Sequence, residues 1–242
     1  MSRPPRTQFP GALHHVTARG NRKANIFRDK FDYLSWQSIV ERAAERFGFA
    51  CHAFCQMPNH YHMLVETPIT NLSEAMHYIN CLYAQAFNVR HELSGHVLQG
   101  RFHSVLLEDE SHFLELARYI PLNPVRAGLV AGAGEWGWSS YRATAGLAAP
   151  PAWLDTETIL QRFHGETDRE RIGAFCEFVA AGIGGRDPLK PPPLPAPNGK
   201  LDRQQAIAQA LQAGCYSPAE IAKHFQVSTK TVQRIRAAEA AR

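Results

Sequence analysis

Hydrophobic and polar positions follow a helical period over two long segments of this chain. Residues 30–47 and 71–91 place apolar side chains every three to four positions, which predicts two amphipathic helices. Gly48 follows the first segment directly and is a typical helix end. A third helix is predicted from Ser111 onward, and it carries Tyr119.

Between these helices, short apolar or alternating stretches predict β-strands. The predicted strands are residues 13–18, 49–56, 60–66 and 105–107. Strand, helix, strand, strand, helix, strand is the split βαβ order of ferredoxin-like domains. The chain is therefore predicted to be an α+β protein with an antiparallel sheet, helices on one face of that sheet, and residues 60–66 on an inner strand.

The C-terminal part of the chain follows a different pattern. Residues 150–185 read as mainly helical, and residues 187–200 are rich in proline, which predicts a semi-rigid linker. Ser217-Pro218-Ala219-Glu220 is typical of a helix start. The segment 221–235 resembles a helix-turn-helix, so residues 201–242 are predicted to form a small all-α domain.

In this helix-turn-helix, Ser228 is expected to cap a second helix that enters a groove of duplex DNA. The side chains predicted to face the DNA are Ser228, Thr229, Lys230, Gln233 and Arg234. A three-helix bundle that contacts other proteins is the alternative.

Composition narrows the class of protein. The apolar and charged fractions of 45% and 20% are those of an ordinary globular protein. No run reaches the roughly 18 apolar residues of a membrane span, and the N-terminus lacks the apolar stretch of a signal peptide. We expect a cytoplasmic, nucleoid-associated protein without membrane contact. Five scattered cysteines argue against a disulfide framework.

Charge is unevenly distributed. Residues 200–242 hold seven Lys/Arg against three Asp/Glu, whereas residues 1–199 hold nineteen of each. The first 30 residues add a basic arm, with seven Lys/Arg against Asp29 alone. A basic arm and a basic tail suit a polyanionic partner, although a solvated surface explains the charge equally well.

The segment 57–66 carries the most specific chemistry. His60 and His62 are two residues apart on a predicted strand, so they point to the same face and can grip a divalent metal, with Tyr61 on the opposite face. A structural zinc site formed by these histidines with Cys51 and Cys55 is the alternative.

The segment 118–130 offers Tyr119 and, four residues later, Asn123 on the same helical face. Pro121 lies between them and is expected to kink the helix.

These two segments, in this order, resemble the REP-associated tyrosine transposases, a branch of the HUH single-strand endonucleases. The resemblance covers roughly residues 10–145 and includes Val16–Arg22, Gly100–Phe102 and Trp138–Tyr141. It implies a catalytic domain over residues 1–145 and a helical extension over residues 146–186.

The resemblance also implies an activity, namely cleavage and transfer of single-stranded hairpin DNA such as REP-like palindromes. Tyr119 would be the nucleophile of a 5′-phosphotyrosine intermediate, and His60, His62 and Asn123 would hold Mg²⁺ or Mn²⁺. The larger group often works as dimers, which makes a homodimer one expected arrangement. Duplex DNA is an additional expected partner through the C-terminal domain.

Several further residues are candidate DNA contacts, because guanidinium groups grip phosphate and aromatic rings stack on unpaired bases. They are Arg19, Arg22, Arg101, Phe102 and Arg126. Two alternative functions remain open: a hairpin-binding module that does not cleave DNA, and a transcriptional regulator acting through the helix-turn-helix.

Overall fold

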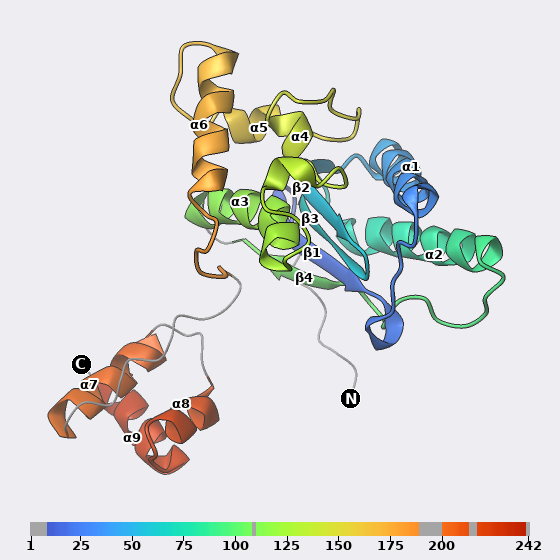
Figure 1. The fold of residues 1–242 in the computed structure, drawn as a ribbon. Helices are drawn as coiled ribbons and strands as arrows, with labels where there is room; N and C mark the ends of the chain where they lie inside the picture. Colours follow the sequence, from blue (N-terminus) through green and yellow to red (C-terminus); the bar gives the residue numbers. More distant parts are fainter. Residues whose placement is uncertain (1–8, 108–109, 189–199, 213–216, 241–242) are drawn as a thin grey trace. The chain divides into compact units, whose positions relative to one another are not determined.

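The computed structural model describes residues 9–107, 110–188, 200–212 and 217–240. The chain forms two compact units, Met1–Arg186 and Asp187–Arg242 (Figure 1). Most of the predicted proline-rich linker, and the first eight residues of the predicted basic arm, lie outside the described residues.

A four-stranded antiparallel sheet forms the centre of the first unit. Its strands, in the spatial order β2-β3-β1-β4, are β1 (Ala12–Arg19), β2 (Ala50–Met57), β3 (His60–Thr67) and β4 (His103–Leu106). Helix α1 (Lys30–Phe47) connects β1 to β2, and α2 (Leu72–Arg90) connects β3 to β4. This order confirms the predicted ferredoxin-like α+β fold and places the histidine pair on the inner strand β3.

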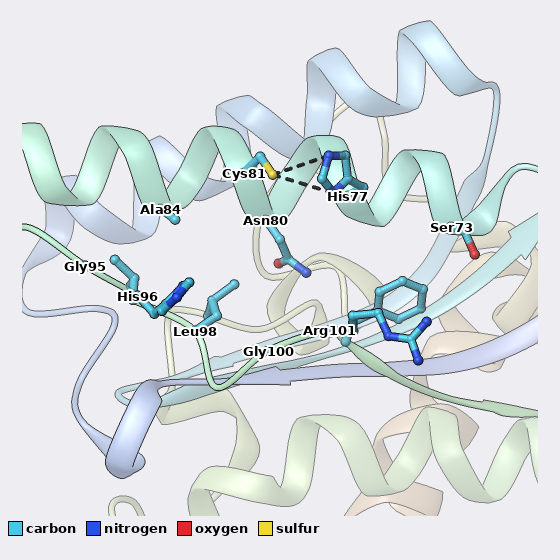
Figure 2. A pocket seen from close by; sticks show the side chains of 12 residues that line it. Ser73, His77, Asn80, Cys81, Ala84, Gly95, His96, Leu98, Gly100 and Arg101 are labelled. Atoms are coloured by element: carbon cyan, nitrogen blue, oxygen red, sulfur yellow. Dashed lines mark hydrogen bonds between the residues drawn. The ribbon is translucent and has the colours of Figure 1, made fainter. Parts of the chain in front are cut away.

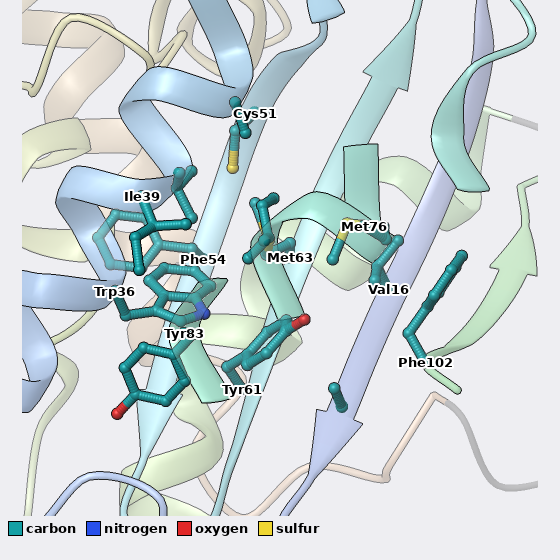
Figure 3. Packing of buried hydrophobic residues seen from close by; sticks show 14 of the residues in the cluster. Val16, Trp36, Ile39, Cys51, Phe54, Tyr61, Met63, Met76, Tyr83 and Phe102 are labelled. Carbon is teal, nitrogen blue, oxygen red and sulfur yellow. The ribbon is translucent and has the colours of Figure 1, made fainter. Parts of the chain in front are cut away.

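Helices cover both faces of the sheet, not one face as the sequence predicted. Helices α1 and α2 lie on the first face, and α3 (Glu110–Arg126) packs on the other face against β2 and β3 (Figure 1). The difference arises because β2 and β3 are buried from both sides. Tyr61 and Met63 join the apolar core under α1 and α2 (Figure 3), whereas Leu64 joins the core under α3 with Phe113.

The local sequence explains why α1 begins and ends where it was predicted to. The Asp29 carboxylate accepts hydrogen bonds from the backbone N–H groups of Phe31 and Asp32, at 2.9 Å and 3.3 Å. At the other end, Gly48 adopts a left-handed conformation with φ of 68°. A polar N-cap and a C-terminal glycine are the usual helix boundaries.

Residues 127–186 form a set of short elements that belongs to the first unit. They are η2 (Ala133–Glu135), α4 (Tyr141–Thr144), α5 (Glu157–Leu160) and α6 (Asp168–Ala180). One further 3₁₀ turn of the first unit, η1 (Asn21–Lys23), follows β1. Residues 127–186 contact the sheet at the buried imidazole of His52 on β2. Its ring nitrogens lie 3.2 Å from the carboxylates of Glu66 and Asp155.

The turn after α6 approaches α3 closely. A Cβ atom at Gly182 would lie 2.6 Å from Arg118 Cδ and 2.8 Å from Leu122 Cδ1, so only glycine fits without displacement. The extension thereby supports the helix that carries Tyr119.

The second unit is helical, with α7 (Lys200–Gln212), α8 (Pro218–His224) and α9 (Thr229–Ala240) around its own apolar core. Ser217 and Glu220 form a capping box at the start of α8, with Pro218 at its first position. Among the described residues, no helix is both long enough and apolar enough to cross a membrane.

Candidate active site

His60 and His62 project from β3 toward the face that α3 covers, with ring centroids 5.0 Å apart. Each ring is held through its Nδ1 atom. His60 Nδ1 lies 2.6 Å from the Asn59 side-chain oxygen, and His62 Nδ1 lies 2.9 Å from His15 Nε2. The Nε2 atom of His62 is buried and has no hydrogen-bond partner among the described residues.

Burial disfavours the charged form of both imidazoles. It lowers the pKa of His60 to about 4, with a further lowering by the nearby Arg19 guanidinium. Burial also lowers the pKa of His62 well below its usual value, and the neighbouring His15 and His60 act in the same direction. Neutral imidazole is the form that binds metal ions, so neither ring would have to lose a proton first.

Tyr119 approaches the histidines from α3. Its ring stands edge-on to His62, with centroids 5.8 Å apart and planes at 88°, and edge-on to His15 at 6.4 Å. Tyr119 is only 8% exposed, so most of its side chain is buried beside the histidines. The structure therefore brings Tyr119 and the histidine pair together, although they are nearly 60 residues apart in the sequence.

The side chain of Asn123 supports the backbone of α3, a helix that continues through Pro121 and Pro124. Pro124 has no N–H to offer the Ile120 carbonyl. The Asn123 amide nitrogen donates to that carbonyl at 3.2 Å and to the Tyr119 carbonyl at 3.0 Å. Because both partners are carbonyls, Oδ1 must be the atom that points away from them, and it keeps lone pairs for another ligand.

These donors fit a divalent metal ion. His62 Nε2 is a buried nitrogen without a partner, His60 presents its Nε2 because Nδ1 faces an acceptor, and Asn123 adds an amide oxygen. In the described parts of the chain, no group of three or more His, Cys, Asp and Glu residues is arranged to hold a metal. A three-ligand site at the histidine pair therefore needs a donor of another kind, and the Asn123 oxygen is the candidate from the sequence.

The structural zinc alternative is wrong. A β-bulge between Cys51 and Ala53 shifts the alternation of β2, so Cys51 packs in the core under α1 and Cys55 in the core under α3. The two thiols therefore lie on opposite faces of β2. Burial also raises the pKa of both thiols, which disfavours the thiolate that zinc requires.

The predicted DNA contacts occupy different environments. Arg19, Arg22 and Arg101 are exposed, and Arg19 pairs with His60 across the β1–β3 ladder. Arg126 lies over the Tyr119 ring, 5.4 Å from its centroid, and donates to the Gly185 and Arg186 carbonyls at 3.0 Å each. Phe102 is only 5% exposed and packs in the core under α2 (Figure 3).

A groove of about 540 Å³ lies between α2 and the segment that leads into β4 (Figure 2). Arg101 lines it, and Asn80 in its wall accepts a hydrogen bond from the Tyr61 hydroxyl at 2.7 Å. The groove opens on the α2 side of the sheet, whereas the histidine pair faces α3.

His15 is the site residue that sequence reasoning missed. It has no spacing motif of its own, because its partner His62 lies 47 residues away. The predicted topology puts β1 beside β3, but only the register of that pairing shows that His15 points to the same face as His62.

In the second unit, the Ser228 hydroxyl accepts a hydrogen bond from the Thr231 N–H at 3.1 Å and so caps α9. The remaining residues predicted to face DNA, Thr229, Lys230, Gln233 and Arg234, are all exposed on this helix.

The resemblance seen in the sequence implied a tyrosine transposase, and comparisons with known proteins find similarity to transposases. Residues 9–122 match the family model "Transposase IS200 like". Over this part the chain is similar to the IS200-like transposases, which supports an enzyme of the transposase class.

Individual relatives support the same family. A curated protein of Haemophilus influenzae, named as a REP-associated tyrosine transposase, is 27% identical over 123 residues, which are 46% of this chain and 69% of that protein. The solved structure of a REP-associated tyrosine transposase bound to a REP hairpin matches with a TM-score of 0.53 and 20% identity. The match covers 64% of this chain and 92% of that chain. The predicted resemblance is confirmed.

Proposed function

We propose that the first unit cuts and transfers single-stranded DNA at hairpins of the REP type, with Tyr119 as the nucleophile. The observation that carries this proposal is the Tyr119 ring standing edge-on, 5.8 Å from the ring of His62, whose buried Nε2 has no partner among the described residues. The proposed nucleophile and an unsatisfied ligand atom thus lie close together in one buried site.

In the proposed reaction, the Tyr119 oxygen attacks the scissile phosphorus and its proton leaves. A tyrosyl O–P bond forms at the 5′ side, and the bond to the 3′ oxygen breaks, which takes up a proton and leaves as a 3′-hydroxyl. Phenolate is a better leaving group than alkoxide, so a 3′-hydroxyl of a second strand can reverse the step. No nucleotide cofactor is needed for this balance.

Mg²⁺ or Mn²⁺ held by His60, His62 and Asn123 would supply positive charge at the phosphate oxygens. The chain itself adds the Arg126 guanidinium, 5.4 Å from the centre of the Tyr119 ring, where a cation favours the phenolate over the phenol. Arg19 is the last residue of β1 and lies beside His60, where its guanidinium can bind a phosphate of the DNA backbone.

For the remaining candidates, we propose that Arg22 and Arg101 contact phosphates, and that Phe102 reaches a base only if the groove beside it opens. The chain would then comprise a catalytic domain (1–145), an extension that supports α3 (146–186), a linker (187–200) and a duplex-binding helix-turn-helix (201–242). Exposed Lys230, Gln233 and Arg234 on α9 support the last assignment.

The test is a nicking assay on end-labelled single-stranded palindromes with Mg²⁺ or Mn²⁺. Denaturing gels should show labelled DNA covalently attached to the protein. His60→Ala should remove the adduct, because it removes one metal ligand. His164→Ala removes an exposed imidazole elsewhere in the first unit and should leave the adduct unchanged.

The same assay separates the alternative functions. Tight hairpin binding with no adduct, across several palindromes and both metal ions, would support a binding module instead of an enzyme. Sequence-specific duplex binding and a retained biological effect in residues 200–242 alone would support a regulator.

A further inference from the structure

A third imidazole, that of His15, lies beside the histidine pair. In the antiparallel β1–β3 ladder Thr17 lies opposite His62, so both side chains point to the same face of the sheet. His15 is two residues before Thr17 and therefore points to that face as well. The rings of His15 and His62 are nearly parallel, with centroids 5.2 Å apart and planes 4° apart. His15 is 2% exposed, which excludes a role in direct contact with solvent.

The hydrogen bond between these rings has two possible directions. His15 Nε2 lies 2.9 Å from His62 Nδ1, and one of the two nitrogens must carry the hydrogen. If His62 donates, its Nε2 keeps a lone pair. If His15 donates, neutral His62 carries its hydrogen on Nε2, which is buried without a partner among the described residues. In both arrangements His62 Nε2 is a buried atom without a partner among the described residues, but only the first gives it a lone pair that a metal ion can satisfy.

His60 shows which arrangement the site favours. Its Nδ1 faces the Asn59 side-chain oxygen at 2.6 Å, so a neutral His60 that donates this bond keeps its lone pair on Nε2. His62 is held at the same atom, Nδ1, by a different neighbour. Two imidazoles anchored through Nδ1 both present Nε2, which is the arrangement that supporting hydrogen bonds produce at metal sites.

We propose that His15 is a positioning residue for the active site, which accepts a hydrogen bond from His62 Nδ1 and thereby fixes the tautomer that leaves a lone pair on His62 Nε2. His15 is not itself a ligand, because its Nε2 is engaged with His62. The inference rests on the proposed function, in which His62 binds a divalent ion.

Three substitutions separate this role from simple packing. His15→Phe keeps a ring of similar size but removes the acceptor. His15→Gln places an amide oxygen at the reach of the lost Nε2 and restores an acceptor. His14→Phe is the matched control, because His14 is equally buried on the same strand and points to the opposite face.

Two measurements on the full chain test the proposal. Titration with Mn²⁺ alone should show roughly 10- to 100-fold weaker binding for His15→Phe, most of the affinity restored in His15→Gln, and no change in His14→Phe. Long-range ¹H–¹⁵N NMR of the metal-free protein should show His62 protonated at Nδ1 in the wild type and in His15→Gln. In His15→Phe this preference should be lost.

Wild-type Mn²⁺ affinity in His15→Phe, or a wild-type His62 protonated at Nε2, would overturn the positioning role. Failure of the proposed function looks different: wild-type protein would bind Mn²⁺ and show the expected tautomer but form no covalent DNA adduct. A DNA adduct in the wild type with unchanged Mn²⁺ binding in His15→Phe would remove only the role of His15.

Discussion

The two faces of strand β3 serve different purposes although their residues alternate along one strand. Tyr61, Met63 and Val65 point toward α1 and α2 and are buried in an apolar core. His60 and His62 point toward α3 and place imidazole nitrogens where burial lowers their pKa. The first face stabilises the fold, and the second holds the proposed active site at some cost in stability.

The difference follows from the cost of burying polar atoms. An apolar side chain contributes roughly 1.5–3 kcal/mol when it is fully buried, whereas a buried nitrogen without a partner costs roughly 1–3 kcal/mol. Without a ligand, the buried His62 Nε2 atom therefore does not stabilise the fold. A costly arrangement that persists in a packed sheet is expected at a functional site.

The largest difference between the two faces should appear when a tyrosine on each side is replaced by phenylalanine and formation of the DNA adduct is compared. Tyr119→Phe removes the proposed nucleophile and should abolish the covalent DNA adduct, a loss on the order of 1,000-fold or more in rate. Tyr61→Phe, on the other face, removes only a hydrogen bond to Asn80 and should keep the adduct while costing about 1 kcal/mol of stability. Denaturing gels and urea unfolding measure the two effects. An adduct that survives Tyr119→Phe would contradict the assignment of the nucleophile.

The next largest effect is on stability, and along β3 it should be larger for Met63 than for His62. Met63→Ala opens a cavity in the core and should lower the free energy of unfolding by roughly 2–5 kcal/mol. His62→Leu removes a buried unpaired nitrogen along with the bond to His15, so its effect should stay within about 1 kcal/mol. Urea unfolding of both variants measures this, and equal losses would mean that His62 stabilises the fold as Met63 does.

The apolar face could be predicted from the sequence because its signals are local. The bounds of α1 follow from Asp29 and Gly48, and the order of elements identifies the ferredoxin-like sheet. The same-face placement of His60 and His62 follows from strand alternation, which needs no knowledge of the rest of the chain.

The second face could not be predicted fully, because it depends on contacts distant in sequence. The bulge after Cys51, which separates the two cysteines, depends on how β2 pairs with β3. The position of α3 on the opposite face depends on its packing against β2 and β3 and on its contact with the extension, including the close approach of Gly182. His15 becomes visible only when the β1–β3 register is known.

Two glycines of the extension test whether it supports the second face. Gly182→Ala would force a Cβ against Arg118 and Leu122 of α3, which should cost roughly 1–3 kcal/mol of stability. Gly173→Ala is the control, because its Cβ would meet nothing within 4 Å inside α6, and alanine should raise stability by up to about 1 kcal/mol. The midpoint temperature of thermal unfolding of both variants measures this effect. An unchanged midpoint for Gly182→Ala would show that the extension can shift away from α3 without loss of stability.

The smallest expected effect concerns Asn123, which links stability and chemistry on the second face. Asn123→Ala removes the amide that satisfies the Ile120 carbonyl beside Pro124, so it should lower the free energy of unfolding by about 1 kcal/mol. Asn123→Gln keeps the amide but lengthens the side chain, so carbonyl bonding and a metal-directed oxygen can no longer both keep their positions. If Asn123 is a ligand, Mn²⁺ binding should weaken in both variants, whereas unchanged binding would reduce Asn123 to a support for the helix. Because the stability change is small, a loss of Mn²⁺ binding could not be ascribed to unfolding.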